Sequence, residues 1–233
     1  MITDDNFATI VEAISEGRAI YRNIQKFIFF LLSSNAGLAV AVFATSFSGR
    51  WLPLTPLMIL WINLVTNGLP ALALGIDAPD PKLMEEPPRS RLASLVGARD
   101  LLGLAYVGVV MGCAAIAMYA WTYCEHAAGP QGPRTLAFTV LALSPLFHAW
   151  SCRSPTESIL RAKPLVSVPL LVVMVVSAAI QLVALLIPAL RPVFRTDALS
   201  RHDWTMVFIA SIAVVPAVEI AKVLSRLARK RAA

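Results

Sequence analysis

Three polar side chains stand close together inside an otherwise apolar segment: Asn63, Thr66 and Asn67. Their i, i+3 and i+4 spacing places all three on one face of a helix. Gly68 and Pro70 follow directly and predict a helix break, which would free backbone carbonyl groups at the same depth. Oxygen atoms of this kind are the ligands of hard cations, so the segment is a candidate cation site. The alternative is that these polar groups only hold neighbouring helices together.

A second polar cluster, two serines followed by Asn35, lies in an earlier apolar segment. We expect Asn35 to face Asn63 and Asn67 across a helix pair, because Gly37 permits close approach. The two serines are expected to bond back to carbonyl groups of their own helix. His148, in a later apolar segment, is a further candidate ligand, although a lone helical histidine is more often a packing residue.

The candidate ligands Asn35, Asn63, Thr66 and Asn67 are all neutral. Ca²⁺ takes about 6–8 oxygen ligands and usually includes carboxylates among them. None of the apolar segments carries Asp or Glu near its centre, and Glu219 lies toward the inner end of the last one. Another helix would therefore have to supply negative charge to the site.

The segments that must position these residues are long and apolar. The chain of 233 residues is 58% hydrophobic and only 15% charged, and a membrane-spanning helix needs about 20 mostly apolar residues. The segments that fit are Phe27 to Phe47, Leu54 to Ile76, Leu101 to Tyr123, Leu136 to Cys152, Val166 to Leu190, and Trp204 to Leu224. We therefore expect an all-α polytopic membrane protein with six transmembrane helices.

The basic residues predict the orientation of these helices. If both termini are cytoplasmic, 15 of the 20 Lys and Arg residues lie on the inner side, as the positive-inside rule requires. The net charge of +6 then reflects topology, with the lipid bilayer as partner and no nucleic acid. The basic tail from Arg226 to Arg231 suits an anionic inner leaflet.

Two cytoplasmic pieces connect to the spans. An amphipathic helical pattern from Asp4 to Lys26 runs into the first span without a break and predicts one continuous rod. The acidic, proline-rich loop from Asp77 to Ser90 suits a contact surface, although a solvated linker would have the same composition.

Glu219 and Lys222 are expected to pair with each other or with lipid headgroups. Cys113, Cys124 and Cys152 are odd in number and show no metal-ligand spacing, so we expect buried or incidental thiols.

The chain contains no apparatus for ATP hydrolysis. It has neither a glycine-rich phosphate loop of the Walker type nor an Asp-Lys-Thr-Gly-Thr sequence around a phosphorylatable aspartate. We therefore expect no cofactor to bind this chain alone and no ATP hydrolysis by it.

These motifs resemble the carboxyl-terminal membrane half of a P-type cation-transporting ATPase, of the branch that contains the calcium pumps. The pieces that carry the resemblance are Asp4 to Val11 with Glu16-Gly-Arg18, Asn23 to Phe27, Ser33 to Gly37, Leu60 to Gly75, Met84 with Pro87 to Ser90, Phe147 to Ser154, and Pro216 with Glu219 and Lys222. In order, they are similar to the end of the phosphorylation domain, the fifth helix in two pieces, the sixth helix, the loop after it, the eighth helix and the tenth. The pairing of Asn-Leu-Val-Thr-Asn-Gly-Leu-Pro with Pro-Pro-Arg-Ser is the most specific part.

The resemblance implies a division of the chain. Residues 1–26 would be the end of the phosphorylation domain and the extension of the first helix, and residues 27–233 the transmembrane domain. It also implies that Asn35, Asn63, Thr66 and Asn67 occupy cation-ligand positions. The coupling loop to the phosphorylation domain would include Asp77, Asp80, Pro87, Pro88 and Arg89. A glutamate ligand of the calcium pumps is replaced by Leu38, their sixth-helix aspartate by Asn67, and their eighth-helix glutamate falls at or beside Pro145.

The expected function is therefore that of a membrane transport half in a multi-pass protein of the bacterial inner membrane. The parent pump would use ATP and Mg²⁺ and move a cation, Ca²⁺ by resemblance, with an amino-terminal half supplying the catalytic domains. The alternative is a stand-alone membrane protein that passes cations passively or binds and regulates a pump. The losses of acidic ligands suggest fewer ions per cycle or a different ion.

Overall fold

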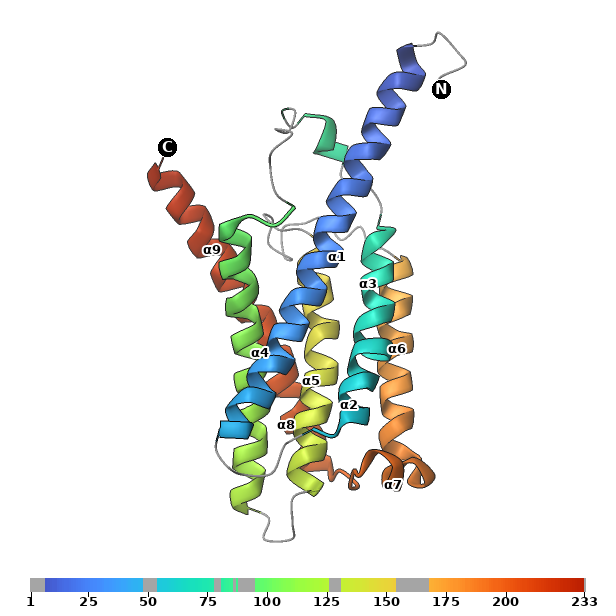
Figure 1. Ribbon diagram of the computed structural model, residues 1–233, viewed down its shortest axis with the longest axis vertical. Coiled ribbons are helices and arrows are strands. Elements are labelled where there is room, and N and C mark those ends of the chain that lie inside the picture. Colours follow the sequence, from blue (N-terminus) through green and yellow to red (C-terminus); the bar gives the residue numbers. More distant parts are fainter. Residues whose placement is uncertain are drawn as a thin grey trace.

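The computed structural model describes residues 7–47, 54–77, 81–85, 87, 95–125, 131–153 and 168–232. Almost all of them are helical, and the described residues contain no strand. The elements are α1 (Phe7–Phe47), α2 (Pro56–Trp61), η1 (Ile62–Asn67), α3 (Gly68–Gly75), η2 (Pro81–Met84), α4 (Ala98–Glu125), α5 (Gln131–Cys152), α6 (Val168–Leu186), η3 (Pro188–Leu190), α7 (Arg191–Phe194), α8 (Arg201–Ile212) and α9 (Val214–Ala232). They form one elongated bundle (Figure 1).

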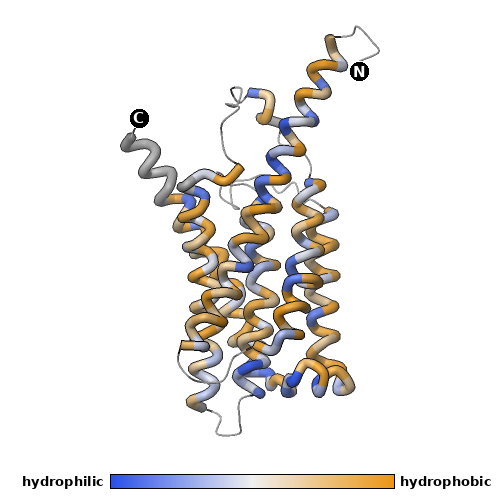
Figure 2. The backbone as a smooth tube through the Cα atoms, in the orientation of Figure 1, coloured by the Kyte–Doolittle hydropathy of each residue, from blue (hydrophilic) through white to orange (hydrophobic). Residues whose placement is uncertain are grey.

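The six expected membrane spans are confirmed within the described residues. Each lies in a helix, or in consecutive helical elements, long and apolar enough to cross a bilayer. Figure 2 shows apolar residues along the middle of the bundle and hydrophilic residues gathered at its two ends. The amino end of α1 and the carboxyl end of α9 lie at the same end, as an even number of crossings requires (Figure 1). The chain is a multi-pass membrane protein.

The predicted continuous rod is confirmed by α1, which runs unbroken through 41 residues. Its amino-terminal part projects beyond the rest of the bundle (Figure 1). Apolar side chains on this projecting part are exposed, among them Phe7 at 76% and Ile20 at 59%. A helix of this length links the membrane-embedded part of the bundle rigidly to the space outside it.

Helices α1 and α4 pack at very short distance through three glycines. A Cβ atom on Gly112 would lie 2.6 Å from Val40 Cγ1, and one on Gly108 would lie 2.6 Å from Ala36 Cβ. On α1, a Cβ atom on Gly37 would lie 2.9 Å from Met111 Cβ. Small residues at such spacing let helix backbones approach in lipid, where hydrophobic burial drives no association.

Helix α5 is the central helix of the bundle. It contacts α1, α3, α4, α6, α8 and α9 as well as η1, and 83% of its membrane window is buried. The helix begins at Gln131, earlier than the expected Leu136, and continues through Pro145. Residues on all sides of α5 are therefore in contact with protein, which makes it the frame against which the other helices are placed.

The last span consists of two helices. α8 ends at Ile212 and α9 begins at Val214. Pro216 explains the division, because it has no N–H with which to bond the carbonyl group of Ile212 and its ring crowds that carbonyl. Lys222 on α9 then donates to the Ser151 carbonyl oxygen at 2.9 Å and lies 3.4 Å from Glu219 Oε1. The expected pairing of Lys222 with Glu219 is confirmed, and the lysine also joins α9 to the end of α5.

Candidate cation site

The polar segment of the second span is a widened helical turn. Ile62–Asn67 form a π-helix, η1, between the α-helices α2 and α3. Pro70 lies in the first turn of α3, where a proline is tolerated, but it has no N–H for the Thr66 carbonyl group. The sequence predicted a helix break at Gly68 and Pro70. This prediction is wrong, because the chain remains helical through both residues. Gly68 keeps a right-handed helical backbone (φ −62°, ψ −48°), and the irregular turn lies immediately before it.

The four candidate ligands fall into two pairs. Thr66 and Asn67 are buried at 0% and 1% exposure, whereas Asn35 and Asn63 are exposed on the surface of the bundle. The Thr66 hydroxyl donates to the Ile62 carbonyl oxygen at 2.9 Å. Among the described residues, no hydrogen bond joins any two of these four side chains. The structure therefore places two candidates inside and two at the surface.

The side-chain amide of Asn67 is buried without a hydrogen-bonding partner in the described part of the chain. This holds for both Oδ1 and Nδ2. Leaving a buried polar group unpaired costs about 1–3 kcal/mol. The unpaired amide of Asn67 therefore lowers the stability of the folded bundle. π-Helical turns are also rare and are found frequently at functional sites. The amide oxygen of Asn67 is of the type that binds hard cations.

The sequence predicted that Gly37 brings α1 close to the helix of Asn63 and Asn67, and this prediction is wrong. Gly37 packs on Met111 and Gly108 of α4. Two residues along a helix correspond to a rotation of about 200°, so Asn35 lies on the side of α1 away from that contact and is exposed. The close approach that Gly37 permits is therefore between α1 and α4.

His148, on α5, is fully buried where α5 packs against α1. Its Nε2 lies 2.9 Å from Ser33 Oγ and 3.2 Å from Cys152 Sγ, and its ring lies beside those of Phe29 and Phe30. Ser33 also bonds back to the Phe29 carbonyl oxygen, as expected. These contacts are those of a packing residue. No group of three or more His, Cys, Asp or Glu side chains suited to a metal occurs among the described residues.

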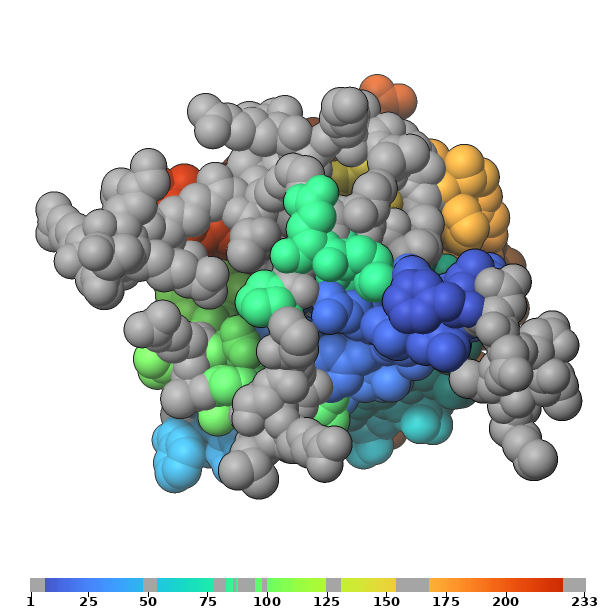
Figure 3. Space-filling view, turned by 90° about the horizontal axis from the view of Figure 1, so that it is seen from above, coloured from blue at the N-terminus to red at the C-terminus, as the bar shows by residue number. Residues whose placement is uncertain are grey.

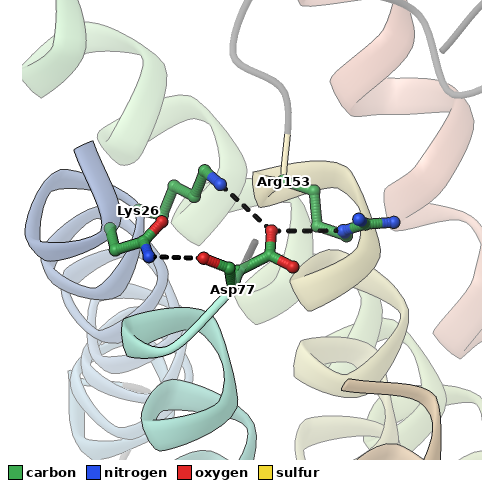
Figure 4. Close-up of polar contacts among 4 residues, drawn as sticks. Lys26, Asp77 and Arg153 are labelled. Carbon is green, nitrogen blue, oxygen red and sulfur yellow. Dashed lines mark hydrogen bonds and ion pairs between the residues drawn. The ribbon is translucent and has the colours of Figure 1, made fainter. Parts of the chain in front are cut away.

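Asp77, at the end of the second span, is the centre of an ionic junction (Figure 4). Its Oδ2 lies 3.0 Å from Lys26 Nζ and 3.3 Å from Arg153 Nε. Its backbone carbonyl accepts a hydrogen bond of 2.7 Å from Asn23 Nδ2. The carboxylate side chain is only 2% exposed. The junction fixes Asp77, two residues beyond α3, to α1 on one side and to Arg153, directly after α5, on the other.

Two described residues that follow Asp77 in the chain, Leu83 and Leu95, are hydrogen-bonded to α1. Arg18 Nη1 donates to the Leu83 carbonyl oxygen at 3.0 Å, and Gln25 Nε2 donates to that of Leu95 at 3.0 Å. Figure 3 shows η2 beside the amino-terminal half of α1. Pro87 is exposed. The other predicted coupling residues, Asp80, Pro88 and Arg89, lie outside the described residues.

No local pattern in the sequence identifies Lys26 and Arg153 as the partners of Asp77. Each of the three residues directly flanks an expected apolar segment, and this common position was the available signal. The Gly108-x-x-x-Gly112 spacing on α4 was a second signal of close helix packing.

The chain matches a known protein family and two curated relatives over most of its length. The family model described as "Cation transporting ATPase, C-terminus" matches residues 51–224. The calcium-transporting ATPase of Bacillus subtilis is 38% identical over 207 residues, which cover 89% of this chain and 23% of that protein. Calcium-transporting ATPase 1 of Bacillus cereus is 38% identical over 237 residues, 95% of this chain and 27% of that protein. The chain spans about a quarter of the length of these relatives.

The matches confirm the resemblance inferred from the motifs of the sixth helix and the loop after it. They cover most of this chain and, by the description of the family, the carboxyl-terminal part of the relatives. The chain belongs to the family of cation-transporting ATPases, whose carboxyl-terminal membrane region it represents.

Proposed function

We propose that the chain is the membrane transport half of an ATP-driven pump for a calcium-like cation, and that Asn35, Asn63, Thr66 and Asn67 provide part of its cation site. The names of the two Bacillus relatives support Ca²⁺ as the transported ion. The observation that carries the proposal is the amide of Asn67, which is buried on a π-helical turn and has no partner among the described residues. A cation would supply the missing partner of its oxygen.

The remaining ligands are proposed to come from an amino-terminal half. Asn35 and Asn63 are exposed at the surface of the bundle, although a polar side chain facing lipid is unfavourable. A helix packed over them would remove both from lipid, and a carboxylate on it would give the neutral site the charge that a divalent cation requires. The same half would bind ATP and Mg²⁺. We place the assembled pump in the bacterial cell membrane with both termini of this chain cytoplasmic.

Transmission of the energy of ATP hydrolysis is proposed to follow α1. The loop from Asp77 to Ser90 is tied to this helix by the Arg18–Leu83 hydrogen bond and by the Asp77 junction. A movement of the projecting part of α1 would therefore move the inner end of α3, and with it the π-helical turn. This proposal gives the loop the coupling role expected from the resemblance.

A chimera tests the function. This chain replaces the matching region of the Bacillus subtilis calcium-transporting ATPase, and inside-out membrane vesicles are assayed for ATP-dependent uptake of radiolabelled Ca²⁺. We expect uptake that is lost in Asn63→Ala and Asn67→Ala and retained in Leu64→Ala, a control on the exposed side of the same turn. A correctly inserted chimera that hydrolyses ATP but never accumulates Ca²⁺ would overturn the calcium assignment. Undiminished uptake in both asparagine variants would overturn the site.

A further inference from the structure

The outer end of the π-helical turn is held by α6 and α7. Trp61 immediately precedes η1, and its indole Nε1 donates to Gln181 Oε1 on α6 at 2.8 Å. The Trp61 ring also meets the Phe194 ring of α7 edge to face, with centroids 5.0 Å apart. Gln181 is completely buried, so its carbonyl oxygen is an acceptor in a site where water offers no substitute.

Phe194 is itself fixed against the central helix. Its ring stacks on that of Phe138 on α5, with centroids 6.1 Å apart, and only 4% of the residue is exposed. Close by, the backbone N–H of Asp197 donates to Thr135 Oγ1 of α5 at 2.9 Å. Through Phe194, Trp61 is therefore connected to α5. Arg153, directly after the other end of α5, holds Asp77.

The π-helical turn lies between two fixed residues, Trp61 before it and Asp77 after it, and these two residues determine the geometry of the turn. Each residue of an α-helix turns the chain by about 100°, and bonding from residue i to i+5 places an extra residue in the turn. Returning η1 to α-helical bonding would therefore rotate Trp61 relative to Asp77 by about 100°. With Trp61 bound to Gln181 and Asp77 bound to Lys26 and Arg153, such a rotation would break one set of contacts.

We propose that Gln181 is a positioning residue for the cation site: by holding Trp61, it keeps the π-helical turn in the geometry that presents Asn63, Thr66 and Asn67. Its role in cation binding rests on the proposed function, whereas its hold on the turn does not. The alternative is that the Trp61–Gln181 hydrogen bond only joins two helices, in which case its loss would lower stability without changing the turn.

Sparse labelling separates these alternatives in the full chain in lipid nanodiscs. The sequence holds five Trp and five Asn residues, so ¹⁵N labels on these two types give few resonances. Gln181→Met keeps the length of the side chain and removes the carbonyl acceptor, and Gln181→Glu keeps an acceptor oxygen. Leu182→Ala, on the neighbouring exposed position of α6, is the matched control.

We expect Gln181→Met to shift the indole resonance of Trp61, assigned with Trp61→Phe, and the side-chain amide resonances of Asn63 and Asn67. Gln181→Glu should restore all three, and Leu182→Ala should leave them unchanged. A shift confined to the Trp61 indole, with Asn63 and Asn67 as in the unaltered chain, would overturn the proposal.

Titration with Ca²⁺ on the same samples adds the functional readout. Where Ca²⁺ shifts the Asn67 amide of the unaltered chain, Gln181→Met should weaken the apparent affinity about fivefold, the value of one hydrogen bond of about 1 kcal/mol. Unchanged affinity would overturn the role of Gln181 in binding. If Ca²⁺ shifts nothing in the unaltered chain, the cation site of this chain alone fails, and the amide shifts in Gln181→Met still decide whether Gln181 holds the turn.

Discussion

Asp77 and Lys26 form an ion pair of 3.0 Å between the end of the second span and the first helix (Figure 4). Arg153 completes the junction from α5. A movement of α1 would therefore act on Asp77 directly and on Arg153 through it. The pair thus links the projecting rod to the span that carries the candidate ligands.

Removal of the Asp77 carboxylate should destabilise the bundle more than removal of either cation. Asp77→Ala leaves Lys26 and Arg153 facing each other without a counter-charge, and breaking a buried ion pair costs about 3–5 kcal/mol. Lys26→Met leaves the Asp77–Arg153 contact and should cost less. The measurement is the midpoint of thermal unfolding of the purified chain in detergent. Equal midpoints for the two variants would contradict the central place of Asp77.

The α1–α4 contact predicts opposite effects for two glycines on one helix. Gly112→Ala would bring a methyl group to 2.6 Å from Val40 Cγ1, and overpacking of this kind costs about 1–3 kcal/mol. Gly103→Ala meets nothing nearer than Phe29 Cζ at 3.8 Å and should gain up to about 1 kcal/mol from helix propensity. Unfolding midpoints of both variants decide this. A Gly112→Ala chain as stable as the unaltered one would argue against the close contact.

Arg18→Ala should reduce turnover of the chimera without reducing its affinity for the cation. The change removes the hydrogen bond to the Leu83 carbonyl oxygen and loosens the loop from α1, far from the π-helical turn. Changes at Pro87, Pro88 or Arg89 are expected to act in the same way. The measurement compares maximal ATP hydrolysis with the Ca²⁺ concentration at half activity, with the exposed Glu16→Ala as control. A parallel loss of rate and affinity would instead indicate a folding defect.

His148→Phe should lower stability and leave cation affinity unchanged. The imidazole of His148 is engaged by Ser33 and Cys152, and a phenyl ring keeps the stacking with Phe30 but offers no hydrogen bond. The measurements are the unfolding midpoint of the chain and the Ca²⁺ dependence of the chimera. A shift of the Ca²⁺ dependence by tenfold or more would return His148 to the set of ligands.

The helices were predictable because their signals are local. Long apolar runs such as Leu101 to Tyr123 have no alternative in a bilayer, and the unbroken pattern into Phe47 predicted the single rod α1. The division at Ala213 was present in the sequence as Pro216 and was not used. Boundaries such as Gln131 depend on packing around α5, which hydropathy does not record.

The candidate site was predictable in composition but not in arrangement. The spacing of Asn63, Thr66 and Asn67 indicated one polar face, yet that inference assumed α-helical geometry. In the π-helical turn Asn67 is buried and Asn63 is exposed. The contact between Trp61 and Gln181 joins residues far apart in the chain and has no local signal at all. Helix pairing, which places Gly37 on α4, depends on side-chain volumes across several helices at once.

The Ca²⁺ dependence of ATP hydrolysis by the chimera, measured for Asn67→Leu and Asn67→Asp beside the unaltered chain, tests the central claim most directly. Because the Asn67 amide has no partner among the described residues, Asn67→Leu should insert and fold at least as stably as the unaltered chain while losing activation by Ca²⁺. Asn67→Asp adds a carboxylate at the proposed ligand position and should increase the apparent affinity tenfold or more. Unchanged Ca²⁺ activation in both variants would contradict a cation site at Asn67.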